Sequence, residues 1–251
     1  MIINFTAIAA ILIAGLLGAP SVKTIPSEAL GPVQYEVRYS LAGIETKVAD
    51  ATISLEEARR DGQAVLHLHA SIKASPFFQL FMNPEYIADS YIALGDMEPV
   101  YYMNPIKNGR KTGKFECIYD KKGGLVSCEF SKPGADPVYL STTNDGFTMD
   151  LLTLIQFVRF HDIPQGKPQS MHLLMAGQSV QANLKCEGLD KERFKGREAV
   201  RYHLEMIGRG LMENGSGNEI TVWCSTSPDH QLLGLSTDLG SGVMSVSISE
   251  K

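Results

Sequence analysis

The stretch KFECIYDKKGGLVSCEF, Lys114–Phe130, is typical of a β-hairpin closed by a turn at Lys121–Gly124. Pairing its halves around that turn places Cys117 directly opposite Cys128. Because side chains alternate between the two faces of a strand, one face is then wholly apolar and a one-residue slip would mix the faces. That face carries Phe115, Cys117, Tyr119, Val126, Cys128 and Phe130. Two opposed cysteines lie within disulfide reach, the alternative being two buried thiols.

The other face of this hairpin places Glu116 opposite Glu129. Like charges directly opposed across two strands are destabilising. We expect Lys114 or Lys132, on the diagonal, to relieve this repulsion. The basic cluster that leads into the hairpin, Lys107–Lys114, also contains two glycines and is typical of a solvated loop.

The N-terminus, MIINFTAIAAILIAGLLGAPSVK, has an apolar run followed by small residues, the outline of a secretory signal peptide. We predict a signal peptide at residues 1–21 and a single antiparallel β domain at 22–251. No basic residue precedes the apolar run, so a buried N-terminal helix or an uncleaved anchor is the alternative. No later run reaches the roughly 18 apolar residues of a membrane span. The mature protein is therefore expected to be periplasmic or secreted, with no transmembrane span after signal cleavage.

An exported chain with four cysteines favours disulfides. Cys186 follows Val180, Ala182 and Leu184 on the apolar face of one expected strand, and Cys224 shares a face with Ile220 and Val222 on another. We predict the bridges Cys117–Cys128 and Cys186–Cys224, one of three connectivities. The chain has no CxxC motif and no closely spaced Cys/His set, so neither redox catalysis nor structural zinc is expected.

Alternation of apolar and polar residues dominates the remaining chain and predicts a mainly β fold with one packed sheet face. The clearest examples are residues 35–41, 48–55, 66–74, 200–206 and 242–250. Thr148–Asp162 is apolar nearly all round, which is typical of a buried helix. Ser75–Pro84 is expected to form one or two helical turns. The net charge of -5 disfavours a nucleic-acid partner.

Several of these segments together resemble an exported bacterial family, domain-of-unknown-function family 3108. The resemblance lies in YEVRYSLAGIETKVADATISL, SPFFQLF, ECIYDKKGGLVSCEF, MDLLTLIQFVRF and the closing EITVWCSTSPDHQLLGLSTDLGSGVMSVSI. Pro228–His230 departs from the pattern, since such families often place the proline later. The resemblance implies a single curved antiparallel sheet around a buried helix, similar to the half-barrel of lipoprotein carriers such as LolA and LolB. It implies no activity and no catalytic residue.

Candidate chemical groups are few. His67 and His69 share one face of a strand, but the sequence indicates no third metal ligand, so a solvated pair is favoured over a metal site. His161–Asp162 and His172 are candidates for a hydrolase, yet no nucleophile motif accompanies them. Asp150 is expected to cap the helix, and Arg159 to lie on its opposite side. We expect no catalytic residue, no cofactor and no metal.

Three functions remain open. In the first, a cavity between the sheet and the short helices binds an apolar small molecule or lipid. The alternative, which the residues favour, is that they simply fill the core. The second is an accessory protein that binds an envelope protein or polysaccharide through its surface, with Tyr101 and Tyr102 as the first place to look. A hydrolase is third. The proposed cavity residues are Phe77, Phe78, Phe81, Tyr91, Phe157 and Trp223.

Overall fold

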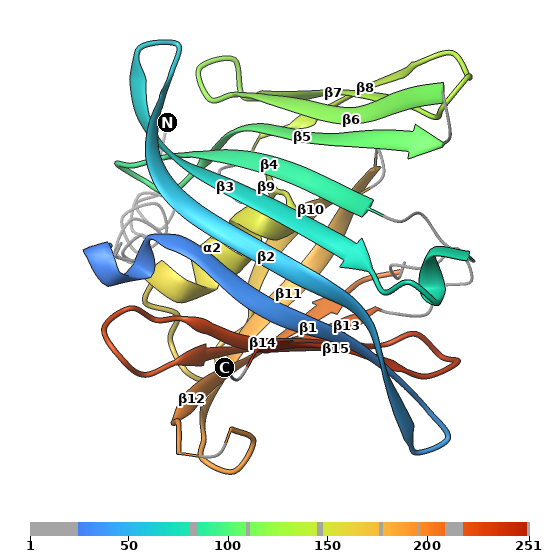
Figure 1. Ribbon diagram of the computed structural model, residues 1–251. Coiled ribbons are helices and arrows are strands. Elements are labelled where there is room, and N and C mark those ends of the chain that lie inside the picture. The colour runs from blue at the N-terminus through green and yellow to red at the C-terminus, as the bar shows by residue number, and fades with distance from the viewer. Residues whose placement is uncertain are drawn as a thin grey trace, which may run out of the picture.

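A computed structural model describes residues 25–80, 85–108, 111–144, 148–175, 178–194, 196–208 and 218–249. The predicted signal peptide lies outside these ranges, as does Phe81. Within them, all strands belong to one curved sheet (Figure 1). The strands are β1 Gly31–Leu41, β2 Ile44–Arg60, β3 Gln63–Ala74, β4 Glu85–Ala93, β5 Pro99–Asn108, β6 Lys111–Asp120, β7 Leu125–Ser131, β8 Val138–Thr143, β9 Thr148–Met149, β10 Gln169–Met175, β11 Gln178–Asp190, β12 Ala199–Met206, β13 Glu219–Ser225, β14 Leu232–Asp238 and β15 Val243–Ile248.

The sheet follows the chain in two runs of antiparallel neighbours. Its order is β8-β7-β6-β5-β4-β3-β2-β1-β15-β14-β13-β12-β11-β10-β9. The first and last strands, β1 and β15, pair with each other and join the two runs. At one edge the short β9 pairs in parallel with β10. The predicted mainly β fold, a single curved antiparallel sheet, is confirmed.

The two edges of the sheet are close in the chain, because β8 ends at Thr143 and β9 begins at Thr148. The hydroxyl of Thr148 donates to the carbonyl oxygen of Thr143 at 3.2 Å. The sheet is nearly closed, and this contact joins its two edge strands.

The β6–β7 hairpin has the register that its sequence predicts. Cys117 pairs with Cys128, and their sulfur atoms lie at disulfide distance. Glu116 does oppose Glu129 on the outer face. The ammonium of Lys114 lies 2.5 Å from Glu116 and 3.0 Å from Glu129, so the expected relief of like charges is confirmed.

The second predicted bridge is wrong. Cys186 and Cys224 are buried, but no disulfide joins them. They stand on β11 and β13, with β12 between the two strands. Neighbouring strands are about 4.8 Å apart, so two strands separated by a third are about 9.6 Å apart, beyond the roughly 7 Å that a disulfide spans between Cα atoms. Alternation correctly assigned both thiols to the core side, but it could not order the strands.

The helix α2, Leu151–Phe160, lies on the concave side of the sheet (Figure 1). Every residue from Leu152 to Phe160 is buried, as the apolar pattern of this segment predicts. The helix is shorter than the predicted Thr148–Asp162, because Thr148–Met149 joins the sheet and Asp150 caps the first turn. It contacts β4, β10 and β13 and so connects the two runs of strands. In the described part of the chain there are also two short 3-10 turns, η1 at Ser27–Ala29 and η2 at Phe78–Leu80.

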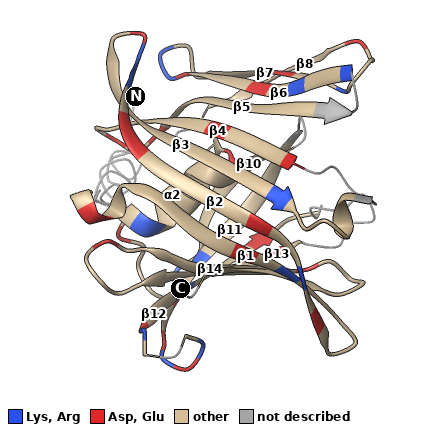
Figure 2. Ribbon diagram, viewed as in Figure 1, with Lys and Arg blue, Asp and Glu red and all other residues tan. Residues whose placement is uncertain are grey.

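Charged residues of both signs are interspersed over the strands and hairpin ends (Figure 2). Ion pairs join several of them across neighbouring strands, such as Lys47 with Glu36 at 3.2 Å. Among the described residues, no helix is long and apolar enough to cross a membrane.

Candidate functional site

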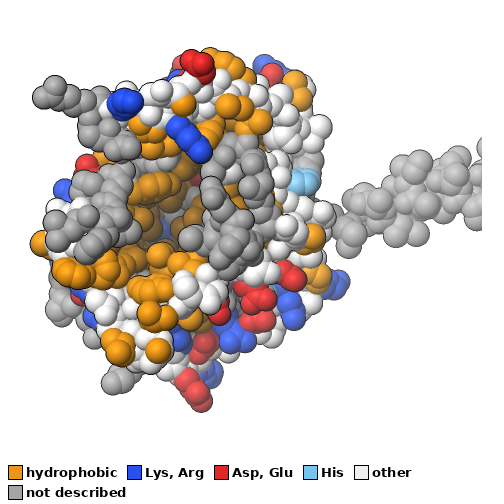
Figure 3. Space-filling view, turned by 90° about the vertical axis from the view of Figure 1, so that its right-hand side faces the viewer, with side chains coloured by type: hydrophobic (Ala, Val, Ile, Leu, Met, Phe, Trp, Pro, Cys, Tyr) orange, Lys and Arg blue, Asp and Glu red, His pale blue; other side chains and the backbone are white. Residues whose placement is uncertain are grey.

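The concave side of the sheet is incompletely filled at one end. Figure 3 shows a hollow on the face where, in Figure 1, β3 ends, η2 lies and β4 begins, and its visible walls are hydrophobic. Ile72, Phe78 and Met175 pack against the main core cluster yet remain partly exposed. Tyr86 pairs with Ile72 across β3 and β4 and is 44 % exposed. Partly exposed side chains on the core side of a sheet indicate open space beside them.

A chain of polar groups lies behind these apolar walls. The hydroxyls of Tyr86 and Tyr102 are 3.1 Å apart. Burial raises the pKa of both tyrosines, so both are neutral donors at physiological pH. Either hydroxyl can be the donor within this pair; when Tyr102 donates, Tyr86 keeps its own hydrogen for a molecule in the otherwise apolar hollow.

Asp150 lies deeper, at the start of α2, and is fully buried. Its carboxylate accepts the backbone N–H of Thr153 at 2.9 Å, and so caps the helix as the sequence predicts. It also accepts the hydroxyls of Thr153 at 2.7 Å and Ser90 at 3.0 Å. Burial raises the pKa of this carboxyl, while these hydrogen bonds act against the rise. The cluster attaches the helix to β4 and leaves an ionisable group in the core.

Arg159 fixes the other end of α2. Its guanidinium donates to the carbonyl oxygens of His230 at 2.9 Å and Asp229 at 3.1 Å, and to the side chain of Gln156 at 2.9 Å. Burial lowers the pKa of this side chain. The Asp229–His230 turn belongs to the segment where the sequence departs from the resembled family pattern. Arg159 therefore ties the helix to the turn between β13 and β14, whereas Asp150 bonds to β4.

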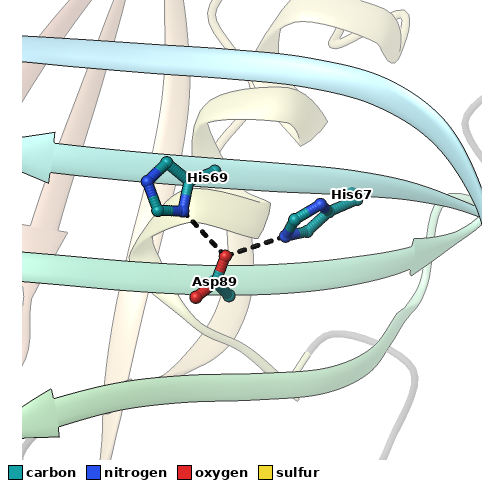
Figure 4. Close-up of side chains that lie close together, drawn as sticks. All are labelled: His67, His69 and Asp89. Carbon is teal, nitrogen blue, oxygen red and sulfur yellow. Dashed lines mark hydrogen bonds and ion pairs between the residues drawn. The ribbon is translucent and has the colours of Figure 1, made fainter.

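A second cluster lies on the outer face of β3 and β4. One carboxylate oxygen of Asp89 is 2.8 Å from Nε2 of His67 and 2.9 Å from Nδ1 of His69, and both rings point toward it (Figure 4). The other ring nitrogen of His67 is 3.0 Å from Glu56. The ring of His67 also stacks on Tyr91, with centroids 4.4 Å apart. A third candidate ligand, which the sequence did not indicate, is therefore present.

Asp89 follows from strand register, because it pairs directly with His69 in the ladder between β3 and β4. Residues 85–93 alternate Ile87, Asp89 and Tyr91 with Ala88, Ser90 and Ile92. Reading this segment as the strand after β3 would have brought Asp89 to the histidine face. The alternation of residues 85–93 is therefore the sequence signal that could have predicted Asp89 beside the two histidines.

Comparisons with known proteins identify the family. Residues 34–247 match the family described as "Protein of unknown function (DUF3108)". The chain belongs to this family. No curated protein matches the sequence. The resemblance recognised in the sequence is thereby confirmed, and it assigns no activity to the hollow or to the histidine cluster.

Solved structures that match this chain include the two that follow. A β-barrel-like protein of domain of unknown function DUF1849 from Brucella abortus has a TM-score of 0.54 at 10% identity, over 92% of this chain and 98% of the other. At 10% identity, this similarity shows the fold alone. The lipoprotein LppX of Mycobacterium tuberculosis has a TM-score of 0.29 at 15% identity, over 98% of this chain and 95% of the other, and we draw nothing from it.

The residues predicted to line a cavity are not all brought together. Phe78 packs on the main core cluster and Phe157 is buried within it, while Phe77 is 64 % exposed and stacks edge-on against Phe78. Tyr91 lies on the outer face beside His67. Trp223 also lies outside, in a separate small cluster with Ala199 and Leu233.

The sequence alone was sufficient to exclude Trp223 from the predicted cavity. Strand alternation places Cys224 with Ile220 and Val222, and the same alternation puts Trp223 on the opposite face. In the structure its indole N–H donates to Asp190 at 2.9 Å and Arg193 lies over its ring. It borders an outer groove of about 410 Å³, lined in part by Glu36, Arg38 and Phe194.

The surface-binding hypothesis loses its main support. Tyr101 and Tyr102 are 9 % and 7 % exposed, so they form no open aromatic patch. Tyr101 instead donates to Glu116, and Arg60 lies 3.5 Å from its ring centre. Burial and the adjacent Glu116 raise the pKa of Tyr101 to about 12.

The hydrolase hypothesis pointed to His161. This residue lines a pocket of about 360 Å³ with Asp162, Cys186 and Tyr202. Its ring stacks on Phe157, with centroids 4.0 Å apart. The stacking on Phe157 accounts for the position of the His161 ring at the end of α2.

Proposed function

We propose that the protein is an exported binding protein that holds an apolar molecule, such as a lipid, on the concave side of its sheet. The observation that carries this proposal is the hollow with hydrophobic walls in Figure 3. Ile72, Phe78 and Met175 contribute apolar surface that the core leaves partly uncovered. A folded protein gains by covering such surface, and a bound apolar molecule does so.

The polar groups of the hollow suit this ligand class. Binding sites for small molecules are mostly apolar, with a few placed polar groups that orient the ligand. Tyr86 supplies a hydroxyl at the hollow, and its contact with Tyr102 holds that group in position. A lipid with one carbonyl or hydroxyl group near its end would satisfy Tyr86 while its chain occupies the apolar walls.

Export is the second part of the proposal. The apolar N-terminal run followed by small residues supports it, and so does a cysteine pair at disulfide distance, which is typical of oxidising compartments. We expect the exported protein to begin at Val22, after cleavage following Ser21. The intact mass of protein recovered outside the cytoplasm checks this, and an uncleaved chain in the membrane fraction would contradict it.

Ligand binding is tested with a matched pair of isoleucines. Ile72 lies on the core side of β3, whereas Ile118 lies on the outer face of β6 and is 55 % exposed. We expect Ile72→Gln to weaken binding of the uncharged probe N-phenyl-1-naphthylamine about tenfold. The reason is that losing the apolar contact of one isoleucine side chain costs about 1.5 kcal/mol of binding free energy. Ile118→Gln should bind as the wild type does. Fluorescence titration gives both affinities.

Native mass spectrometry of the wild-type protein supplies a test that needs no variant. We expect a co-purifying apolar molecule, identified after organic extraction, and its displacement by the probe. A protein that carries no such molecule and binds the probe equally well in both isoleucine variants would refute the proposal. Circular dichroism of each variant confirms that a lost affinity is not a lost fold.

A further inference from the structure

We propose that His67, His69 and Asp89 form a binding site for a divalent transition-metal ion, with Zn²⁺ as the reference cation. This site goes beyond the proposed ligand-binding function, because it lies on the outer face of the sheet while the hollow lies on the concave face. Each residue offers one ligand atom, and these atoms lie within 4.8 Å of one another.

The ligand set suits such an ion. Zinc takes imidazole nitrogens and carboxylate oxygens at about 2.0–2.2 Å, so ligand atoms in a tetrahedral site are about 3.4 Å apart. Asp89 is already nearer than this to both imidazoles, at 2.8 and 2.9 Å. To admit the ion, the Asp89 carboxylate must move roughly half an ångström away from both imidazoles. Two histidines and one carboxylate also leave coordination positions for water or a further ligand.

Neighbouring groups hold the rings in a binding orientation. Metal-binding histidines usually donate their second ring N–H to a carboxylate or carbonyl, which fixes the tautomer. Glu56 lies 3.0 Å from Nδ1 of His67 and can accept that hydrogen, leaving Nε2 for the ion. Tyr91 stacks on the same ring with an interplanar angle of 9°. Any proton held between an imidazole nitrogen and Asp89 leaves to solvent when the metal takes its place.

The three side chains are exposed enough for an ion to reach them from solvent. The side chains of His67 and Asp89 are 18% and 17% exposed, and that of His69 is 39% exposed. The ligands stand on two adjacent strands, β3 and β4, whose ladder pairs His69 directly with Asp89. Sites built on paired strands keep their geometry better than sites on loops.

The test uses full-length mature protein without a polyhistidine tag, stripped of metal and titrated with Zn²⁺ against a chromophoric chelator. We expect one bound equivalent in the wild type. His67→Gln, His69→Gln and Asp89→Asn should each weaken binding at least tenfold, since even an outer partner of a ligand contributes about 10- to 100-fold. Glu56→Gln should weaken it about tenfold. The matched control, His203→Gln, removes a histidine on β12 and should bind as the wild type does.

The same titration can overturn the proposal. A wild type that binds no Zn²⁺, or an Asp89→Asn variant with unchanged affinity, would do so. Wild-type protein loaded with Co²⁺ provides a measurement independent of variant folding. We expect paramagnetically shifted imidazole resonances assigned to His67 and His69, and shifted resonances from other histidines instead would place the ion elsewhere and refute the site.

Discussion

At the scale of the residue, Asp150 combines a predicted role with an unpredicted one. Its place before an apolar helix predicts a cap, and the carboxylate does accept the N–H of Thr153. Its complete burial and its bond to Ser90 on β4 depend on tertiary packing that a local pattern does not contain. The result is a carboxyl whose pKa burial raises.

This raised pKa predicts a pH dependence of stability. A carboxyl with a folded-state pKa above its unfolded value stabilises the fold fully below the unfolded pKa, and that contribution is lost as pH rises through the folded pKa. We therefore expect the free energy of unfolding of the wild type, relative to Asp150→Asn, to fall as pH rises above about 4. Urea unfolding of both proteins between pH 3 and pH 8 measures this difference.

Asp61→Asn is the control for that experiment, since the side chain of Asp61 is 94% exposed. The pH profile of this variant gives the effect of removing an exposed carboxyl, against which the profile of Asp150→Asn is compared. A difference for Asp150→Asn that is flat over the same pH range would mean that Asp150 titrates alike in the folded and unfolded chains.

At the scale of the element, the β6–β7 hairpin was the most predictable part of the molecule. Its turn, its register and the Cys117–Cys128 contact all follow from one stretch, because the partners lie close in sequence. Burial of α2 was equally accessible, since Leu151–Phe160 is apolar on nearly every side.

Elements that depend on neighbours were not predictable in the same way. Cys186 and Cys224 lie on core faces as expected, but the intervening β12 keeps them apart. Asp89 reaches the two histidines only because β4 pairs with β3 in one register. Tyr91 is placed outside by that same register. Strand order and register depend on residues that are far apart in the sequence. The alternation of apolar and polar residues within one strand indicates neither.

The disulfide of the hairpin gives a prediction at this scale. The double variant Cys117→Ala/Cys128→Ala should unfold about 2–4 kcal/mol more easily, because a cross-link restricts the unfolded chain. Urea denaturation measures the change. A reducing agent should lower the stability of the wild type and leave the double variant unaffected. Cys186→Ala, which removes an unbridged buried thiol, should keep its sensitivity to the reductant. A wild type indifferent to reduction would refute the bridge.

At the scale of the whole molecule, the sheet is joined by the pairing of its first and last strands. Val37 on β1 pairs with Val246 on β15, and β15 also pairs with β14. The hydroxyl of Tyr35 donates to the carbonyl oxygen of Leu232, 197 positions along the chain, at 3.2 Å. The two runs of strands therefore enclose α2 and the hollow only when β15 is in place.

This closure predicts that a chain lacking residues 243–251 cannot form the native sheet. Both β1 and β14 would lose their β15 partner, and unpaired strand edges with exposed core faces favour aggregation. We expect size-exclusion chromatography of the truncated chain to show aggregates, and hydrogen exchange to show lost protection along β1. The control is a chain lacking only residues 250 and 251, which should elute and exchange as the full chain does. A monomeric truncated chain that still protects β1 and binds the apolar probe would show that the hollow forms without this closure.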